Sequence, residues 1–134
     1  MSSMPHLMLD IYGVNREVLT DEKEIEALIT AITAVIDMKI VAGPFIIPFV
    51  HKARTGSLEH FTLDGIVIIA TSHVSIHTLP HKNMLFVDVF SCKSFDQERV
   101  LALVCEWLKV TPENIDRTPV ERATRSPREE IVSA

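Results

Sequence analysis

The hydrophobic positions along the chain follow two periods. In residues 6–12, the aliphatic residues Leu7, Leu9 and Ile11 occupy every second position, which is the period of a strand. Apolar runs rich in β-branched residues predict further strands over residues 40–50, 61–70, 74–78 and 84–90. Because the first of these runs contains prolines, which lack the N–H that a sheet ladder needs, we expect it to be an edge strand or an interrupted one.

Helical spacing appears in two other segments. Asp21 followed by Glu24 resembles an N-terminal cap, and apolar residues then recur every three or four positions until near Lys39. Ser94 with Gln97 matches a capping box ahead of a second apolar helix face. Residues 51–59 are polar and contain a glycine, so they predict a loop.

The predicted order of elements is β-α-β-β-β-β-α. Short links between consecutive strands favour antiparallel pairing, and two helices on one face would complete the core. The sequence therefore predicts an α+β fold, a two-layer α/β sandwich with a mainly antiparallel sheet and two helices on one face. We expect a single domain over residues 1–118, followed by a polar, flexible C-terminal tail over residues 119–134.

Composition narrows the class of protein. A chain of 134 residues with 47% hydrophobic and 23% charged residues is long enough for one globular domain. The formal net charge of -5, without a basic stripe, argues against a nucleic-acid partner. No apolar run approaches the roughly 20 residues that span a bilayer, and the N-terminus lacks signal-peptide features. We therefore expect a cytoplasmic protein with no membrane partner.

Chemically useful side chains stand where two apolar runs end. Thr71 and Ser72 follow the first run, His77 comes five residues after Ser72, and Cys92 follows the second run. Rigid scaffolds usually present chemistry at such strand ends. Cys105 lies in a helical pattern and is expected to be a buried filler.

A histidine ladder near this segment raises the question of a metal. His73, His77 and His81 are spaced by four residues, which on a helix would place them on one face. The residues between them are β-prone and Pro80 opposes a helix, so a strand would spread these side chains over about 13 Å. We therefore expect no metal site.

Three motifs in order carry a family resemblance. They are His6–Tyr12 followed by Arg16–Leu19, the segment Ser72–Thr78, and the strand Phe86–Cys92. With these, residues 6 to 118 resemble the pyruvoyl-dependent S-adenosylmethionine decarboxylase family in its short prokaryotic proenzyme form. The resemblance implies self-cleavage between Thr71 and Ser72. The Ser72 hydroxyl attacks the Thr71 carbonyl, and His77 acts as acid or base in processing.

The same resemblance implies a cofactor and partners. Ser72 becomes a pyruvoyl group, which forms a Schiff base with the substrate amine and accepts electrons as carbon dioxide leaves. Cys92 is the implied proton donor to the substrate carbon. The implied substrate is a small amino-acid-type molecule of polyamine (spermidine) biosynthesis, by default S-adenosylmethionine. The family also implies a homodimer of proenzymes with each site built from both protomers.

Four positions depart from the family pattern. Thr71 replaces a glutamate, and Asp64 stands where a serine assists processing. Asp64 is thus a candidate processing group, although Asp before Gly is also a common turn. His81 replaces a glutamate that binds the ribose, and Leu58 stands where an aromatic ring stacks on adenine. Two alternatives therefore stay open: an L-arginine or L-ornithine decarboxylase on the same scaffold, and a processing-dead homologue without catalysis.

Overall fold

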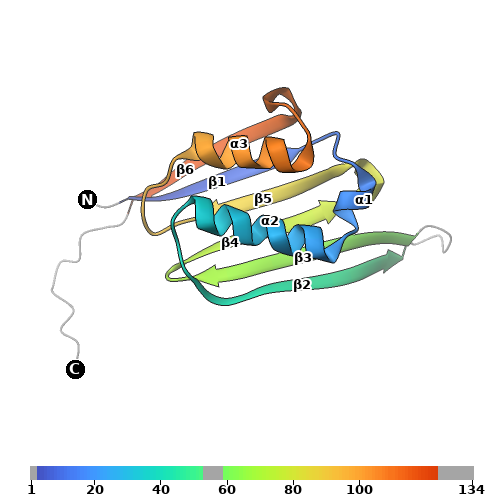
Figure 1. Ribbon diagram of the computed structural model, residues 1–134, viewed down its shortest axis with the longest axis horizontal. Coiled ribbons are helices and arrows are strands. Elements are labelled where there is room, and N and C mark those ends of the chain that lie inside the picture. The colour runs from blue at the N-terminus through green and yellow to red at the C-terminus, as the bar shows by residue number, and fades with distance from the viewer. Residues whose placement is uncertain (1–2, 53–58, 124–134) are drawn as a thin grey trace.

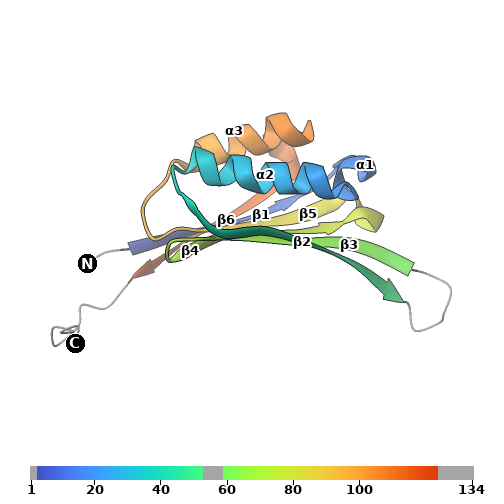
Figure 2. The ribbon, with the colours of Figure 1, turned by 60° about the horizontal axis from the view of Figure 1, so that its bottom comes forward.

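Six antiparallel strands form one sheet in the order β2-β3-β4-β5-β1-β6, with the helices on one of its faces (Figures 1 and 2). The computed structural model describes residues 3–52 and 59–123. Its elements are β1 (Ser3–Ile11), α1 (Arg16–Leu19), α2 (Glu22–Val35), β2 (Ile40–Lys52), β3 (Glu59–Ile69), β4 (Ser72–Leu79), β5 (Met84–Phe90), α3 (Gln97–Leu108) and β6 (Ile115–Ala123), with 3-10 turns at Pro80–Lys82 and Pro112–Asn114. The predicted α+β sandwich is confirmed.

The core lies between the sheet and helices α2 and α3. Every second residue of the strands, such as Leu9, Val67 and Val87, is fully buried in this core. The reason is that successive side chains on a strand point to opposite faces of the sheet. Helix α2 contributes one apolar face, in which Ile29 is fully buried. A Cβ added at Gly65 would lie 2.8 Å from Ile29 Cδ1, so the glycine allows α2 to pack close to β3.

Several predicted boundaries differ from the structure. Asp21 caps α2 as expected, by accepting from the N–H groups of Lys23 and Glu24, but α3 is capped by Asp96 rather than Ser94. Residues predicted as the start of the tail, 119–123, form the end of strand β6. Pro119 is tolerated there because β6 is an edge strand. Residues 124–134 of the predicted tail, and 53–58 of the predicted loop, lie outside the described residues.

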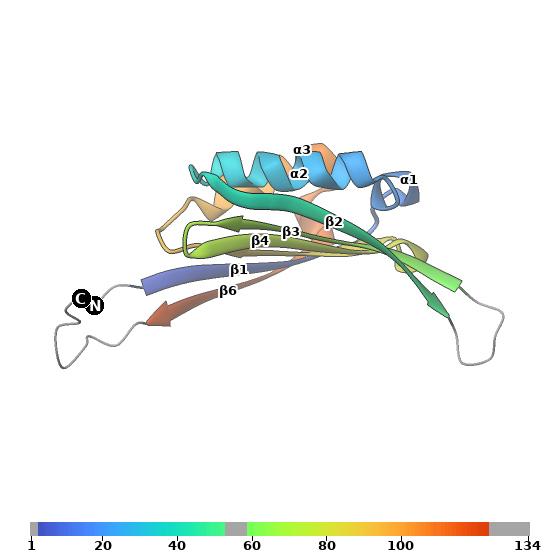
Figure 3. The same ribbon diagram turned by 90° about the horizontal axis from the view of Figure 1, so that it is seen from below.

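The second face of the sheet carries no helix among the described residues, and we call it the open face (Figure 3). Large apolar side chains lie exposed on it, in β2 and β3: Phe45, Ile47, Phe49, Ile66 and Ile68. Contiguous exposed apolar surface of this kind marks an interaction site in most soluble proteins. No helix among the described residues is long and apolar enough to cross a membrane.

Candidate active site

The turn between β3 and β4 has a strained backbone. Ile69 pairs with Ser72, so only Ala70 and Thr71 form the turn. Thr71 has φ 56°, in the left-handed region that β-branched residues rarely adopt. A conformation of this kind costs of order 1–3 kcal/mol, and residues that retain such strain cluster at active sites. The strain lies directly beside the Thr71–Ser72 peptide bond.

The Ser72 hydroxyl is held by two partners at this turn. It donates to the carbonyl oxygen of Ala70 at 3.2 Å and accepts from the backbone N–H of Cys92 at 2.7 Å. The Cys92 thiol donates to the same Ala70 oxygen at 3.3 Å. Strand register explains this meeting, because β4 lies between β3 and β5 and both neighbouring strands have an end beside Ser72.

The segment after β5 that carries Cys92 is fixed to the rest of the fold. The ammonium group of Lys93 donates to the Asp37 backbone carbonyl oxygen at 2.7 Å. The backbone N–H of Lys93 donates to the Ser91 hydroxyl. Cys105, by contrast, lies in α3, where burial raises the pKa of its thiol. Of the two cysteines, Cys92 is therefore the one positioned at the turn.

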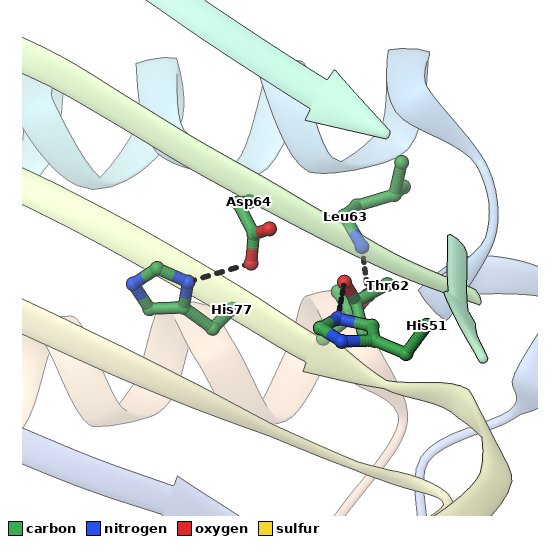
Figure 4. Close-up of polar contacts among 6 residues, drawn as sticks. His51, Thr62, Leu63, Asp64 and His77 are labelled. Atoms are coloured by element: carbon green, nitrogen blue, oxygen red, sulfur yellow. Dashed lines mark hydrogen bonds and ion pairs between the residues drawn. The ribbon is translucent and has the colours of Figure 1, made fainter. Parts of the chain in front are cut away.

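His77 and Asp64 form a second polar pair on the open face. They are opposite each other in the β3–β4 register, and His77 Nδ1 lies 2.8 Å from Asp64 Oδ1 (Figure 4). The pair lines a hollow of about 250 Å³ together with Ile47, Ile66 and Ser75. Both side chains are part-exposed, so the hollow is accessible from outside the protomer.

The structure does not bring His77 to Ser72 within one chain. The two residues are separated by an odd number of positions on β4, so their side chains point to opposite faces of the sheet. Ser72 is buried on the helix side, whereas His77 is exposed on the open face. Five residues of strand also separate them by about 17 Å along β4. Within one protomer His77 therefore does not reach Ser72, and its implied role in processing stays a prediction.

Two other histidine groups lie on the open face. At the Ser72 end, the rings of His73 and His6 approach to 6.3 Å, and burial, followed by the charge of His6, lowers the pKa of His73. At the far end, His81 stacks on His60 at 4.0 Å, and burial, followed by His60, lowers the pKa of His81. No three metal-ligating side chains converge on a metal site within residues 3–52 and 59–123.

Comparison with known proteins identifies the family to which this chain belongs. The sequence profile described as S-adenosylmethionine decarboxylase matches residues 5–122. The chain belongs to the S-adenosylmethionine decarboxylase family. The predicted family is thereby confirmed, and with it the expected class of enzyme, since these pyruvoyl-dependent decarboxylases are carboxy-lyases made as proenzymes.

Individual relatives agree with this assignment. An S-adenosylmethionine decarboxylase proenzyme of Clostridium botulinum (strain Langeland) is 32% identical over 104 residues, which is 77% of this chain and 81% of the relative. A proenzyme of the same name from Archaeoglobus fulgidus is 28% identical over 105 residues. The crystal structure of the adenosylmethionine decarboxylase from Aquifex aeolicus has the same fold, with a TM-score of 0.69, 21% identity, and 97% and 98% of the two chains covered.

Sequence reasoning missed two features of this family member's site. It treated Asp64 as an assisting group or a turn residue, without its bond to His77, and it overlooked the bond from Lys93 to the Asp37 carbonyl. A detectable signal existed for the first. Once the hairpin turn is placed at Ala70 and Thr71, the antiparallel register pairs position 64 with position 77. Leu58, at the position where the family pattern has an adenine-stacking ring, lies outside the described residues.

Proposed function

We propose that this chain is a self-cleaving, pyruvoyl-dependent decarboxylase of polyamine biosynthesis with S-adenosylmethionine as substrate. The observation that carries the proposal is the meeting of Ser72 and Cys92 at the strained Thr71 turn. Family membership and curated proenzyme relatives over 77% of the chain support it. The contacts of the Ser72 hydroxyl, to the Ala70 carbonyl oxygen and from the Cys92 N–H, favour cleavage over the processing-dead alternative.

The residues at the turn suit a rearrangement of the peptide bond. The Ser72 hydroxyl attacks the Thr71 carbonyl carbon, the C–N bond breaks, and an ester forms while the amine takes the proton. The N–H of Cys92 orients the attacking oxygen, and leaving the left-handed conformation at Thr71 releases strain. A base then removes the Ser72 α-proton, the ester C–O bond breaks, and Thr71 leaves with a carboxylate. Water converts the remaining dehydroalanine to a pyruvoyl group, with loss of ammonia.

The residues present at this position fit the pyruvoyl group. Ser72 is the strand residue from which it forms, and the Cys92 segment lies against its side chain. The group supplies a ketone that condenses with a substrate amine and accepts the electrons freed by loss of carbon dioxide. Cys92 holds a proton beside that position, on a thiol that is part-buried and oriented by the Ala70 carbonyl. We assign Cys92 the return of that proton to the substrate carbon.

The base for the α-proton comes, in this proposal, from a second copy of the chain. His77 and its own Ser72 are on opposite faces and about 17 Å apart, so one protomer does not complete the site. A partner stacked on the open face approaches the α-proton with its own imidazole.

A twofold-symmetric dimer, in which the open faces of two protomers stack on each other, would bring His77 of one protomer to Ser72 of the other. Ser75 and Asp88 pair in the β4–β5 ladder, about midway along β4 between Ser72 and His77. An axis near this middle row places the Ser72 end of one protomer over His77 of the other, and the reverse, as an isologous dimer requires. The exposed apolar residues of β2 and β3 become buried in the same contact.

The substrate is tested by carbon dioxide release. Processed protein is incubated with carboxyl-labelled S-adenosylmethionine, L-arginine and L-ornithine in separate reactions, and the released label is captured. We expect release from S-adenosylmethionine. The Ser72→Ala protein is the blank, since it lacks the electron acceptor. Release confined to arginine or ornithine would refute the proposed substrate while leaving the decarboxylase mechanism intact.

That second substrate class has one specific observation in its favour. The position implied to bind ribose hydroxyls through a carboxylate is His81, whose ring stacks on His60. A neutral imidazole accepts a hydrogen bond more weakly than a carboxylate does, and burial, followed by His60, lowers the pKa of His81. L-Arginine and L-ornithine have no ribose, so they lose nothing by this replacement.

Replacing Cys92 with alanine separates cleavage from turnover. The backbone N–H that orients Ser72 remains, so we expect the chain still to be cut. The thiol proton is lost, and decarboxylation should slow by about 10²–10⁴-fold, as for other general acids. Labelled carbon dioxide release by fully cleaved protein measures the effect. Cys105→Ala is the matched control, and equal rates for the two variants would exclude the assigned role of Cys92.

A further inference from the structure

The Asp64–His77 hydrogen bond determines which ring nitrogen of His77 carries a proton. His77 Nδ1 lies 2.8 Å from Asp64 Oδ1 on the neighbouring strand (Figure 4). An ionised carboxylate has no hydrogen to donate and can only accept. The hydrogen of this bond therefore belongs to Nδ1. In the neutral ring, Nε2 is then left with its lone pair, which is the form needed to remove a proton.

We propose that Asp64 is a positioning residue that holds His77 in the Nδ1-protonated tautomer, so that Nε2 is the base of the cleavage reaction. This inference rests on the proposed function, because it specifies how the base of that same site is prepared. Asp64 does not touch the reacting bond in this account. It acts through the imidazole, as the carboxylate of a Ser-His-Asp triad does.

The surroundings of the pair favour this use of Asp64. The two residues are directly opposite in the β3–β4 ladder, where cross-strand neighbours lie close enough to interact. Ile47 and Ile66 form apolar walls beside them, so a partner stacked on the open face would leave little water to compete for the bond. A serine at position 64, the residue type of the family pattern, could donate or accept, and would leave the tautomer of His77 undetermined.

The first test reads the tautomer directly. In a Ser72→Ala background, which keeps the chain intact, the nitrogen-15 chemical shifts of His77 distinguish a protonated Nδ1 from a protonated Nε2. We expect the Nδ1-protonated form at neutral ring charge. Asp64→Asn is expected to move the population toward the Nε2-protonated form, since an amide can donate to Nδ1. An unchanged tautomer in this variant would overturn the inference.

The second test measures cleavage in chains that retain Ser72. We expect Asp64→Asn to slow the appearance of fragments by about tenfold or more. In this variant Nε2 carries the proton, so it has no lone pair with which to act as the base. Asp64→Glu, which keeps an acceptor-only group, should recover part of the rate. Asp10→Asn is the matched control, since it removes a carboxylate from the same face at β1 without contact to His77.

The outcomes separate this inference from the proposed function. Native cleavage rates in Asp64→Asn, with the tautomer shifted, would overturn the role of Asp64 and leave the decarboxylase proposal standing. A parent chain that never cuts would contradict the proposed function, whereas the tautomer measurement does not depend on cleavage. Recovery by Asp64→Glu together with loss in Asp64→Asn is the result that supports the inference, since a merely structural contact would not follow the acceptor character of the side chain.

Discussion

Replacing Ser72 with alanine is expected to abolish cleavage completely and leave one intact chain of 134 residues. The parent protein, by contrast, should separate into residues 1–71 and 72–134 on denaturing electrophoresis. Alanine has no oxygen to attack the Thr71 carbonyl. Among residues 3–52 and 59–123, no other hydroxyl makes both contacts of Ser72, to the Ala70 carbonyl and from the Cys92 N–H. Intact mass spectrometry measures the two states without ambiguity.

The controls for this result lie close in sequence. Ser94→Ala removes an exposed serine beyond β5 and should leave cleavage unchanged. The new terminus of residues 72–134 in the parent protein should react with hydroxylamine or borohydride, as a ketone does. Fragments of normal size from the Ser72→Ala chain, or an unreactive terminus in the parent, would rule out the rearrangement at Ser72.

The sequence predicted the scaffold well because its signals are local. Alternation at Leu7, Leu9 and Ile11 and the helical spacing after Asp21 each depend on a single element, and both were confirmed. Strand β6 was missed because residues 115–123 are polar and contain Pro119. Such a strand is formed by pairing with β1 at the sheet edge, and not by burial of its own side chains.

The site was harder to predict because it depends on register. Ser72 and Cys92 were recognised as chemically important, but their contact follows from the arrangement of β3, β4 and β5, which propensities do not determine. The predicted strand began at Val74, which left the turn too long. With the turn so placed, the opposition of Asp64 and His77 and the burial of Ser72 on the other face could not be derived.

The proposed site shared between two protomers makes a stronger prediction than any single substitution. Two inactive variants should restore cleavage when they share a dimer. His77→Ala alone should slow cleavage by about 10²–10⁴-fold through loss of the base, and Ser72→Ala alone should not cleave. In a mixed dimer, the His77→Ala chain keeps Ser72 and receives an intact His77 from its partner. That chain should then be cut, and the Ser72→Ala chain should stay whole.

Co-expression of the two variants with different affinity tags allows the chains to be followed separately. If they associate at random in equal amounts, about half of the His77→Ala chains find a complementing partner and should appear as fragments. Charged substitutions on the open face, such as Phe45→Glu with Ile47→Glu in both chains, should prevent the recovery, because those side chains are exposed in the protomer and buried in the proposed contact. If tandem purification of dimers bearing both tags yields only intact chains, His77 does not act across the interface.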